Sequence, residues 1–314
     1  MKKILYFSIL GMVIFGCGKK FPLPEESNQG MPSEKEYVEI QNTEWDNLTF
    51  SHLKDVLLGE DGYVYVLSSD TLYKFSTTGE YGNIFSVLDG AVSVTQDVEE
   101  NIYIATNKGM VVKYSWSAEP QDTFDFSFLC NDSTLLDSFL TSIDAAGENH
   151  LVLSSAPLNL VVRFYQDTID TIATYGTGIE YTRRPMGVYA RTYPQIVLYA
   201  SSQNNWVEGL SLIPPHFSMI HLGGDSYNGG TDDTLFLNPV DVYMDDSSCV
   251  YVLDKGNRAM KKFDFEGSLV TVLSLPDDPV AITVSHDGKT LYIAFDDRIR
   301  KYKLPEIPGE GGEQ

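Results

Sequence analysis

Short runs of alternating apolar and polar residues recur along the chain in a constant order. When residues 54–57 (KDVL) are aligned with residues 240–243 (VDVY), residues 64–67 (VYVL) align with residues 250–253 (VYVL) without a gap. Alternation with a period of two predicts β-strands that have one buried and one solvated face. The first register of the repeat places a β-branched residue in one column six times: Val56, Val94, Ile143, Val188, Val242 and Ile282.

Two further registers complete each repeat. The second is an apolar strand that follows a turn such as Glu60-Asp61-Gly62, where glycine adopts positive φ at little cost. The third has an apolar residue followed two places later by a cation and then by an aromatic ring: 72–75 (LYKF), 111–114 (VVKY), 161–164 (VVRF), 260–263 (MKKF) and 299–302 (IRKY). The fourth repeat lacks the cation near residues 210–212 and is irregular there.

Six repeats at intervals of 38–54 residues predict an all-β fold, a six-bladed β-propeller with four antiparallel strands per blade. The last repeat shows only three strands before Pro305. An open ring would expose a strand edge to aggregation, so we expect Tyr37-Val38-Glu39-Ile40 to supply the missing strand. The propeller is therefore predicted over residues 36–304, and residues 305–314 are predicted to be a disordered tail.

One repeat, residues 222–267, resembles the repeat of NHL-type six-bladed propellers. The residues that carry the resemblance are Gly223-Gly224, Asn228-Gly229-Gly230, Phe236, Asn238-Pro239, the strand at 250–252, Asp254, Asn257-Arg258 and the stretch 260–264 (MKKFD). The other repeats share only the strand pattern. The resemblance implies the same six-bladed fold, and it is specific over one repeat.

The N-terminus carries an export signal. Lys2 and Lys3 precede an apolar run over residues 4–15 that ends at Gly16 and Cys17, which is the order of a signal peptide over residues 1–16. Residues 14–17 (IFGC) resemble the bacterial lipobox, which implies that Cys17 receives a lipid. The proline-containing, charged stretch 17–35 is expected to be a flexible tether. Because Gly18-Lys19 lacks an acidic retention signal of the enterobacterial type, we expect a lipoprotein of the outer membrane.

Charge and motifs exclude several classes of partner. The chain has 44 acidic and 22 basic residues, a formal net charge of −22. This balance argues against nucleic acid and anionic headgroups, so we expect membrane contact through the lipid anchor alone. The segment 288–290 (GKT) has Thr283 where a phosphate-binding loop needs glycine, so nucleotide binding is not expected. Cys130 and Cys249 fall in different repeats and are not expected to form a disulfide.

Small or acidic residues precede the β-branched column in every repeat. Such residues allow inner strands to crowd around an axis, which is a packing role. Alternatively, Asp55 and Asp241 line the channel as an oxygen-rich pocket. Resemblance to six-bladed lactonases implies a divalent ion held by several channel carboxylates, although the sequence supplies only these two. A divalent-metal-dependent hydrolase or lyase is therefore the alternative function.

A second candidate metal site lies in one glycine-rich loop. Asp225, Asn228, Asp232 and Asp233 supply the hard oxygen ligands that Ca²⁺ prefers, but their spacing matches no calcium-loop signature. Such loops are also ordinary connectors of this repeat. No serine has the Gly-x-Ser-x-Gly setting of a nucleophile elbow, so no catalytic residue is assigned.

The leading hypothesis is a non-catalytic binding or scaffold propeller for an envelope protein or glycan. Loops on a rigid scaffold concentrate recognition, and aromatic rings are enriched at binding surfaces. The longest interval between repeats contains residues 203–236, and the candidate binding residues there are Trp206, His216, His221, Tyr227 and Phe236. The competing interpretation is packing, because residues 236–240 also match the start of an NHL-like repeat.

Overall fold

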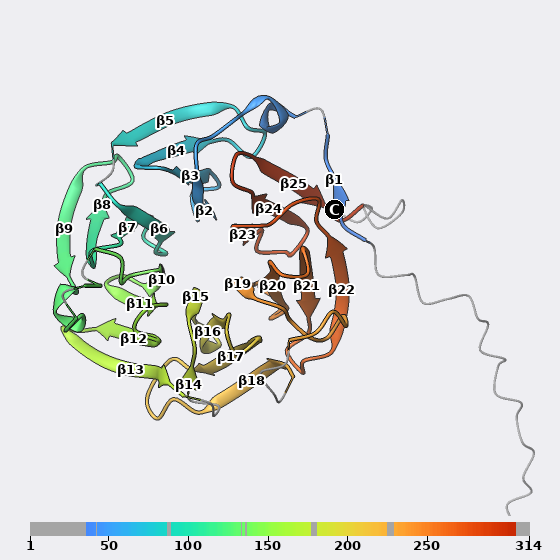
Figure 1. Ribbon diagram of the computed structural model, residues 1–314. Coiled ribbons are helices and arrows are strands. Elements are labelled where there is room, and N and C mark those ends of the chain that lie inside the picture. Colours follow the sequence, from blue (N-terminus) through green and yellow to red (C-terminus); the bar gives the residue numbers. More distant parts are fainter. Residues whose placement is uncertain are drawn as a thin grey trace, which may run out of the picture. The chain divides into compact units, whose positions relative to one another are not determined.

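Six antiparallel sheets are arranged in a ring around a central channel (Figure 1). The computed structural model describes residues 36–41, 43–86, 89–132, 134–135, 137–176, 181–224 and 229–305. All of them belong to one unit of the chain, Lys35–Gln314. The predicted lipidation site at Cys17, the tether and most of the C-terminal tail lie outside the described residues.

Each blade is built from strands that are consecutive in the sequence, except for the last. Blade one comprises β2 (Leu53–Leu58), β3 (Val64–Ser68), β4 (Thr71–Phe75) and β5 (Tyr81–Ser86). Blade two comprises β6 (Ala91–Gln96), β7 (Ile102–Thr106), β8 (Met110–Tyr114) and β9 (Pro120–Asp125). Blade three comprises β10 (Ser142–Gly147), β11 (His150–Ser155), β12 (Leu160–Tyr165) and β13 (Thr168–Tyr175), with β14 (Tyr181–Thr182) parallel to β13.

Blade four comprises β15 (Pro185–Thr192), β16 (Gln195–Ser201), β17 (Trp206–Ser211) and β18 (Ser218–Gly223). Blade five comprises β19 (Pro239–Met244), β20 (Val250–Asp254), β21 (Ala259–Phe263) and β22 (Leu269–Ser274). Blade six comprises β23 (Ala281–Val284), β24 (Thr290–Ala294), β25 (Ile299–Lys303) and the N-terminal β1 (Val38–Glu39). Two short 3-10 helices, η1 (Glu44–Asn47) and η2 (Ser127–Leu129), lie outside the sheets.

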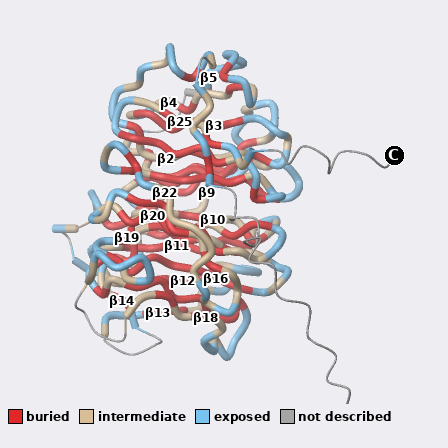
Figure 2. Tube along the Cα trace, turned by 90° about the vertical axis from the view of Figure 1, so that its right-hand side faces the viewer, coloured by how far each residue is buried: buried red, intermediate tan, exposed pale blue. Residues whose placement is uncertain are grey.

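The predicted six-bladed β-propeller is confirmed. The β-branched column lies on the innermost strand of each blade, and all six of its residues are buried. Buried apolar side chains form clusters that each join two neighbouring blades. Figure 2 shows these buried strands inside and the exposed turns at the edges. The hydrophobic effect therefore holds the blades face to face around the ring. Within the described residues, no helix is long and apolar enough to span a membrane.

The cation of the third register has a structural role. In blade one, Lys74 Nζ lies 2.6 Å from Asp61 Oδ2, and the hydroxyl of Tyr65 donates to the same oxygen at 2.7 Å. In blade five, Tyr251 likewise donates to Asp245 at 2.7 Å. The turn aspartate after the first strand is thus neutralised by the third strand and hydrogen-bonded by the second. Turn chemistry within the blade therefore explains the cation in blades one and five. The cations of two other blades have different partners, since Lys113 pairs with Glu148 of the next blade and Arg163 pairs with Asp170 of β13.

Blade four departs from this pattern by reversing the charge. Its third strand is β17, so the register lies at residues 207–210, earlier than the sequence pattern placed it. Glu208 is opposite Tyr199 there, at the position that a cation occupies in other blades. The Glu208 carboxylate is fully buried and accepts hydrogen bonds from Ser218 Oγ and His221 Nδ1, each at 2.6 Å. A buried carboxylate requires such donors, and β18 supplies them.

The NHL-like residues of blade five organise the connection that precedes it. Lys261 Nζ lies 3.2 Å from Asp254 Oδ2, and both side chains are almost completely buried. Asn257 Nδ2 donates to the same oxygen at 2.6 Å, and the backbone N–H of Leu237 donates to Asp254 Oδ1 at 2.9 Å. Because a buried charge must be paired, these contacts hold the segment before β19 against the blade.

The two ends of the propeller meet at blade six. In the structure β1 lies antiparallel to β25 and contains two residues, fewer than the four expected, and Ile40 N–H donates to Lys301 O at 2.9 Å. A second contact reinforces the junction, because Trp45 of η1 is buried between Phe75 of blade one and Tyr292 of blade six, with ring centroids 5.2 and 5.8 Å away. The N-terminal segment therefore clasps the first and last blades. Elsewhere, Cys130 and Cys249 do not form a disulfide.

We predict that Trp45→Ala lowers the free energy of unfolding by about 3–5 kcal/mol, because it removes a fully buried ring at the ring junction. Trp116→Ala is the matched control, since Trp116 is 68% exposed in the turn after β8, and it should change stability by about 0.5 kcal/mol or less. Equilibrium denaturation in urea measures both values. Equal losses in the two variants would contradict the clasp.

Candidate functional site

The predicted binding excursion, residues 203–236, is divided among several elements. Strands β17 and β18 occupy much of it, and the turn at 212–217 and the connection after β18 leave opposite ends of the blade. Trp206 is 4% exposed and Phe236 is completely buried against Phe263, so both rings pack in the interior. His216 donates Nδ1–H to Ser211 O at 2.8 Å. These residues do not form one continuous loop.

The remaining members of that prediction separate further. His221 lies on β18 and donates to Glu208, as described above. Tyr227, Asp225 and Asn228 lie outside the described residues. Asp232 and Asp233 are exposed, and the Asp232 carbonyl accepts from Leu235 N–H at 3.0 Å within a turn.

The channel aspartates have a different role from the one expected. The innermost strand of each blade has one edge that no strand of its own sheet covers, and its N–H groups require acceptors. Asp55 Oδ2 accepts from the backbone N–H of Val94, 2.9 Å away in the next blade, and from Ser93 Oγ at 2.7 Å. Asp241 Oδ2 accepts from Ile282 N–H of the next blade at 2.8 Å. We call these side-chain-to-backbone bonds inter-blade latches.

A second layer of latches lies two residues further along the same strands. Asp144 of blade three accepts from Thr95 Oγ1 at 2.5 Å and from Ala190 N–H of blade four at 2.7 Å. Thr283 Oγ1 of blade six accepts from Leu58 N–H of blade one at 2.9 Å. Residues two apart on a strand face the same side, so both layers point into the channel.

One junction is made differently. Between blades four and five, the described inner strands form no carboxylate or hydroxyl latch. The first-layer position is Gly187, where a Cβ would come within 2.2 Å of Asp241 Oδ1. In the second layer the rings of Tyr189 and Tyr243 lie against each other, with centroids 4.8 Å apart and planes at 52°. Tyrosine contact therefore replaces hydrogen bonding at this junction.

Burial changes the acidity of the latch carboxyls. It raises the pKa of Asp55 to about 6 and that of Asp144 to about 6, with hydrogen bonds opposing the effect. The pKa of Asp241 is raised well above its usual range by burial and then by the charge of Asp55. Three carboxyls that share a narrow channel disfavour one another's ionised forms.

A divalent ion of the lactonase type does not fit these carboxyls. Both oxygens of Asp55 and of Asp241 already accept hydrogen bonds from backbone N–H groups. Across the described part of the chain, no three His, Cys, Asp or Glu side chains are placed to hold a metal ion together. The channel acids therefore serve as inter-blade latches.

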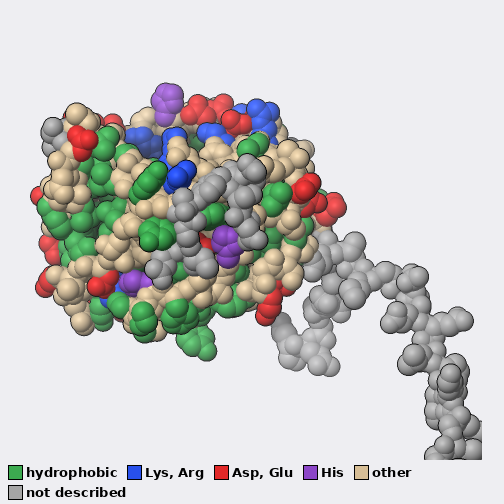
Figure 3. Space-filling model, turned by 60° about the horizontal axis from the view of Figure 1, so that its bottom comes forward, with side chains coloured by type: hydrophobic (Ala, Val, Ile, Leu, Met, Phe, Trp, Pro, Cys, Tyr) green, Lys and Arg blue, Asp and Glu red, His purple; other side chains and the backbone are tan. Residues whose placement is uncertain are grey.

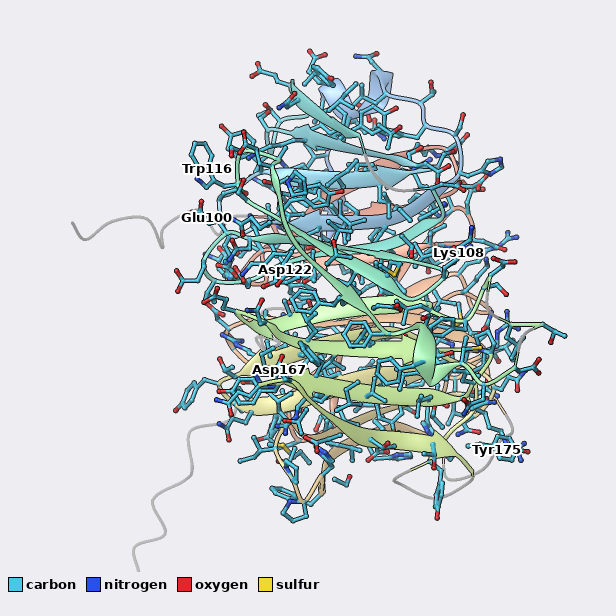
Figure 4. The ribbon with its side chains drawn as sticks, turned by 90° about the vertical axis from the view of Figure 1, so that its left-hand side faces the viewer. Glu100, Lys108, Trp116, Asp122, Asp167 and Tyr175 are labelled. Atoms are coloured by element: carbon cyan, nitrogen blue, oxygen red, sulfur yellow. The ribbon has the colours of Figure 1, made fainter. Side chains whose placement is uncertain are left out.

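The channel opens into a cavity of about 390 Å³ at the end where the inner strands finish, which we call the wide mouth. The titratable and aromatic side chains that line it are those of Glu60, Asp144, Tyr189, Arg191, Tyr193, Tyr243, Asp246 and His286. The middle of the channel narrows to about 40 Å³, and the opposite mouth is about 140 Å³. In Figure 4, Glu100, Trp116 and Asp167 lie on the wide-mouth side, and Lys108 and Tyr175 lie on the other side.

Charged side chains form an arc along part of the wide mouth. Arg191 of blade four donates to Asp245 O at 2.9 Å and to Asp246 Oδ1 at 2.5 Å. His286 of blade six lies between Asp246 and Glu60, 3.7 Å and 3.4 Å from their carboxylates. The arc therefore links blades four, five, six and one, and it fixes the side chains that a ligand would meet first.

Sequence reasoning missed Tyr189, Tyr243 and Arg191. A signal for the two tyrosines was present, because they stand two residues after Gly187 and Asp241, which the alignment had placed at the channel. Extending the period of two by one step along each inner strand identifies the second layer of the channel. Arg191 lies two residues beyond Tyr189 on the same strand and reaches the mouth.

We predict that Asp55→Asn alters the pH dependence of stability. The folded-state pKa of Asp55 is about 6, above the usual 3.8, so its contribution to stability is fully present below about pH 4 and is lost as pH rises through 6. The amide cannot ionise. The melting temperature of the variant relative to the wild type should therefore rise by about 5 °C between pH 4 and pH 7.

The control for this measurement is Asp125→Asn. Hydrogen bonds from the Ser127 hydroxyl and backbone lower the pKa of Asp125, which is the opposite direction to Asp55, so its carboxylate loses none of its contribution to stability as pH rises from 4 to 7. Its melting difference from the wild type should stay flat from pH 4 to pH 7. Identical profiles for the two variants would show that Asp55 is not the group responsible.

Comparison with known proteins agrees with the fold. No family model matches the sequence, and no curated protein is significantly similar to it. Among solved structures, a gluconolactonase from Xanthomonas campestris aligns with a TM-score of 0.61 at 11% identity, covering 84% of this chain and 89% of that protein. A streptogramin B lyase aligns with a TM-score of 0.59 at 12% identity, covering 86% and 97%. The WD40 propeller domain of Doa1 aligns with a TM-score of 0.58 at 13% identity, covering 87% and 98%. At these identities the similarities show the β-propeller fold alone.

Proposed function

We propose that this protein is a binding propeller of the bacterial cell envelope that holds a partner at the wide mouth. The observation that carries the proposal is the cavity of about 390 Å³, whose size is within the range of about 300–1,000 Å³ for ligand pockets. Tyrosine rings and a few fixed polar groups line it, which is the usual composition of a recognition site. Inter-blade latches at the other five junctions hold the blades around it.

The turns around the wide mouth extend this surface. In each blade the first and third strands run in the same direction. The turn after the first strand and the turn after the third strand therefore lie on the same side of the propeller, which is that of the wide mouth. Exposed apolar side chains on this side include Val98 (68%), Trp116 (68%), Tyr193 (86%) and Phe217 (59%). Figure 3 shows hydrophobic side chains among acidic and polar ones on the side of the molecule that carries blades three and four. Exposed aromatic rings on a rigid scaffold support binding to a protein or glycan.

Binding is favoured over the metal-dependent hydrolase or lyase by the hydrogen bonds in the channel. The carboxyl oxygens that such an enzyme would use accept backbone N–H groups, and they hold the ring together. The proteins of similar fold that are named as a lyase and a gluconolactonase share 11–12% identity with this chain, which extends no activity to it.

The address of the protein completes the proposal. The positively charged, apolar and small-residue order of residues 2–17 supports export and attachment through a lipid on Cys17, with the outer membrane as the location. The tether of residues 17–35 would then carry the propeller away from the membrane surface. Attachment through the lipid alone leaves the wide mouth free to face a partner.

We predict that Tyr193→Ala weakens partner binding about tenfold, because it removes an exposed ring at the cavity. The measurement uses the mature chain against arrays of glycans and of peptides, followed by titration of the best ligand. Phe128→Ala is the matched control, since Phe128 is 61% exposed in η2 on the other side of the propeller. Loss of binding with Phe128→Ala alone would place the binding surface on that side.

We also predict that Cys17→Ser abolishes lipid attachment, because serine lacks the thiol to which the lipid is attached. In a bacterial host, the wild type should incorporate a fatty-acid analogue and partition into detergent. The variant should do neither. Undiminished labelling of the variant would contradict the assignment of Cys17.

A further inference from the structure

We infer that the wide-mouth cavity binds an organic ammonium group, such as that of a lysine side chain or a small amine. The inference rests on the proposed function, because it concerns the same cavity, and it adds the chemical class of the ligand. Three observations carry it: the charge of the lining, the tyrosine rings, and hydroxyl groups that the protein does not use.

The lining is negative. Glu60, Asp144 and Asp246 place three carboxylates on the cavity, whereas Arg191 is its one guanidinium among the described lining residues, which leaves a formal charge of −2 with His286 neutral. Arg191 is held by hydrogen bonds to Asp245 O and Asp246 Oδ1, so it does not project free into the cavity. A concave site of one sign concentrates ligands of the opposite sign.

The charges of the lining carboxylates affect the pKa of the two tyrosines on the cavity floor. Burial raises the pKa of the Tyr243 phenol, and the charges of Asp144, Glu60 and Asp246 raise it further, while Arg191 opposes them. The pKa of Tyr189 is also raised, by burial and then by Tyr243 and Asp144. The negative field of the rim therefore extends to the floor of the cavity, where a cation would be stabilised and an anion repelled.

Tyrosine rings complete the cation site. Tyr189 and Tyr243 stand at 52° to each other with centroids 4.8 Å apart, and Tyr193 adds a third ring from the neighbouring turn. The ring quadrupole attracts an ammonium placed over the face of a tyrosine, whereas it repels an anion there.

The hydroxyls of Tyr189 and Tyr243 supply acceptors. Neither has a hydrogen-bond partner in the described part of the chain, although both residues line the cavity. Both side chains are partly exposed, so these oxygens can accept a hydrogen bond from a ligand donor. An ammonium has N–H donors and no acceptor, which matches a site of phenol oxygens and carboxylates.

The first experiment compares probes of matched size by isothermal titration at low ionic strength. We expect n-butylammonium to bind, n-butanol to bind at least tenfold more weakly, and butyrate not to bind. Added salt should weaken the binding of n-butylammonium, because salt screens the electrostatic field that attracts it. Equal affinities for n-butylammonium and n-butanol would overturn the inference.

Variants then assign the binding to the wide mouth. Glu60→Gln and Asp246→Asn should each lower the affinity for n-butylammonium about five- to tenfold. Tyr243→Leu should lower it by the same factor, because it removes a ring. Asp167→Asn is the matched control, since Asp167 is an exposed acid on the same side of the propeller and does not line the cavity. Binding that all three cavity variants leave unchanged would overturn the assignment.

Two arms distinguish the source of the ammonium. A peptide that carries one lysine is compared with the same peptide in which that lysine is acetylated and with free n-butylammonium. Tighter binding of the unmodified peptide than of either other probe supports a basic protein segment, whereas a free amine that binds as tightly supports a small amine. Suppose that a neutral glycan binds in a manner that depends on Tyr193 and that no amine binds. This result would refute the inference of an ammonium ligand but would leave the proposed function standing. If no probe or array ligand depends on Tyr193, both proposals fail.

Discussion

The ring depends on one constraint: the inner edge of each innermost strand must find hydrogen-bond acceptors outside its own sheet. A buried backbone N–H without an acceptor costs about as much as a lost hydrogen bond. Side chains of the adjacent blade solve this at five of the six junctions, through Asp55, Ser93 or Thr95, Asp144, Asp241 and Thr283. Apolar packing stabilises the contact between neighbouring blades, and these hydrogen bonds determine the position of each inner strand relative to the next.

The same constraint decides where chemistry is possible. The channel carboxylates accept backbone N–H groups of the neighbouring blades, so most of the channel serves the fold. The junction of blades four and five is the exception, because Gly187 occupies the first-layer position and the rings of Tyr189 and Tyr243 fill the second. Phenol groups left without a protein partner therefore collect at the wide mouth, beside the arc of charges from Arg191 to Glu60.

Blade four shows how a repeat can change while its shape is kept. In blades one and five a lysine on the third strand lies beside an aspartate in a turn, as Lys74 does beside Asp61. In blade four a buried glutamate takes that place, and Ser218 and His221 on the outer strand satisfy it. The backbone pairing is the same in both cases, so the fold tolerates the reversal as long as every buried polar group has a partner.

The number of blades, their strand order and the buried column could be predicted from the sequence, because a period of two and a repeated register are local properties that a single chain displays. The two-residue length of β1, the latches and the wide mouth could not, because each depends on which residues of separate blades meet across the ring. Trp206 and Phe236 show the difference. In the sequence both rings stand in a segment whose composition is typical of a binding loop. The fold nevertheless buries both rings, because their side chains lie in the interior of the propeller. Composition determined that aromatic rings and acids were available, and only the closing of the ring decided which of them are exposed at the wide mouth.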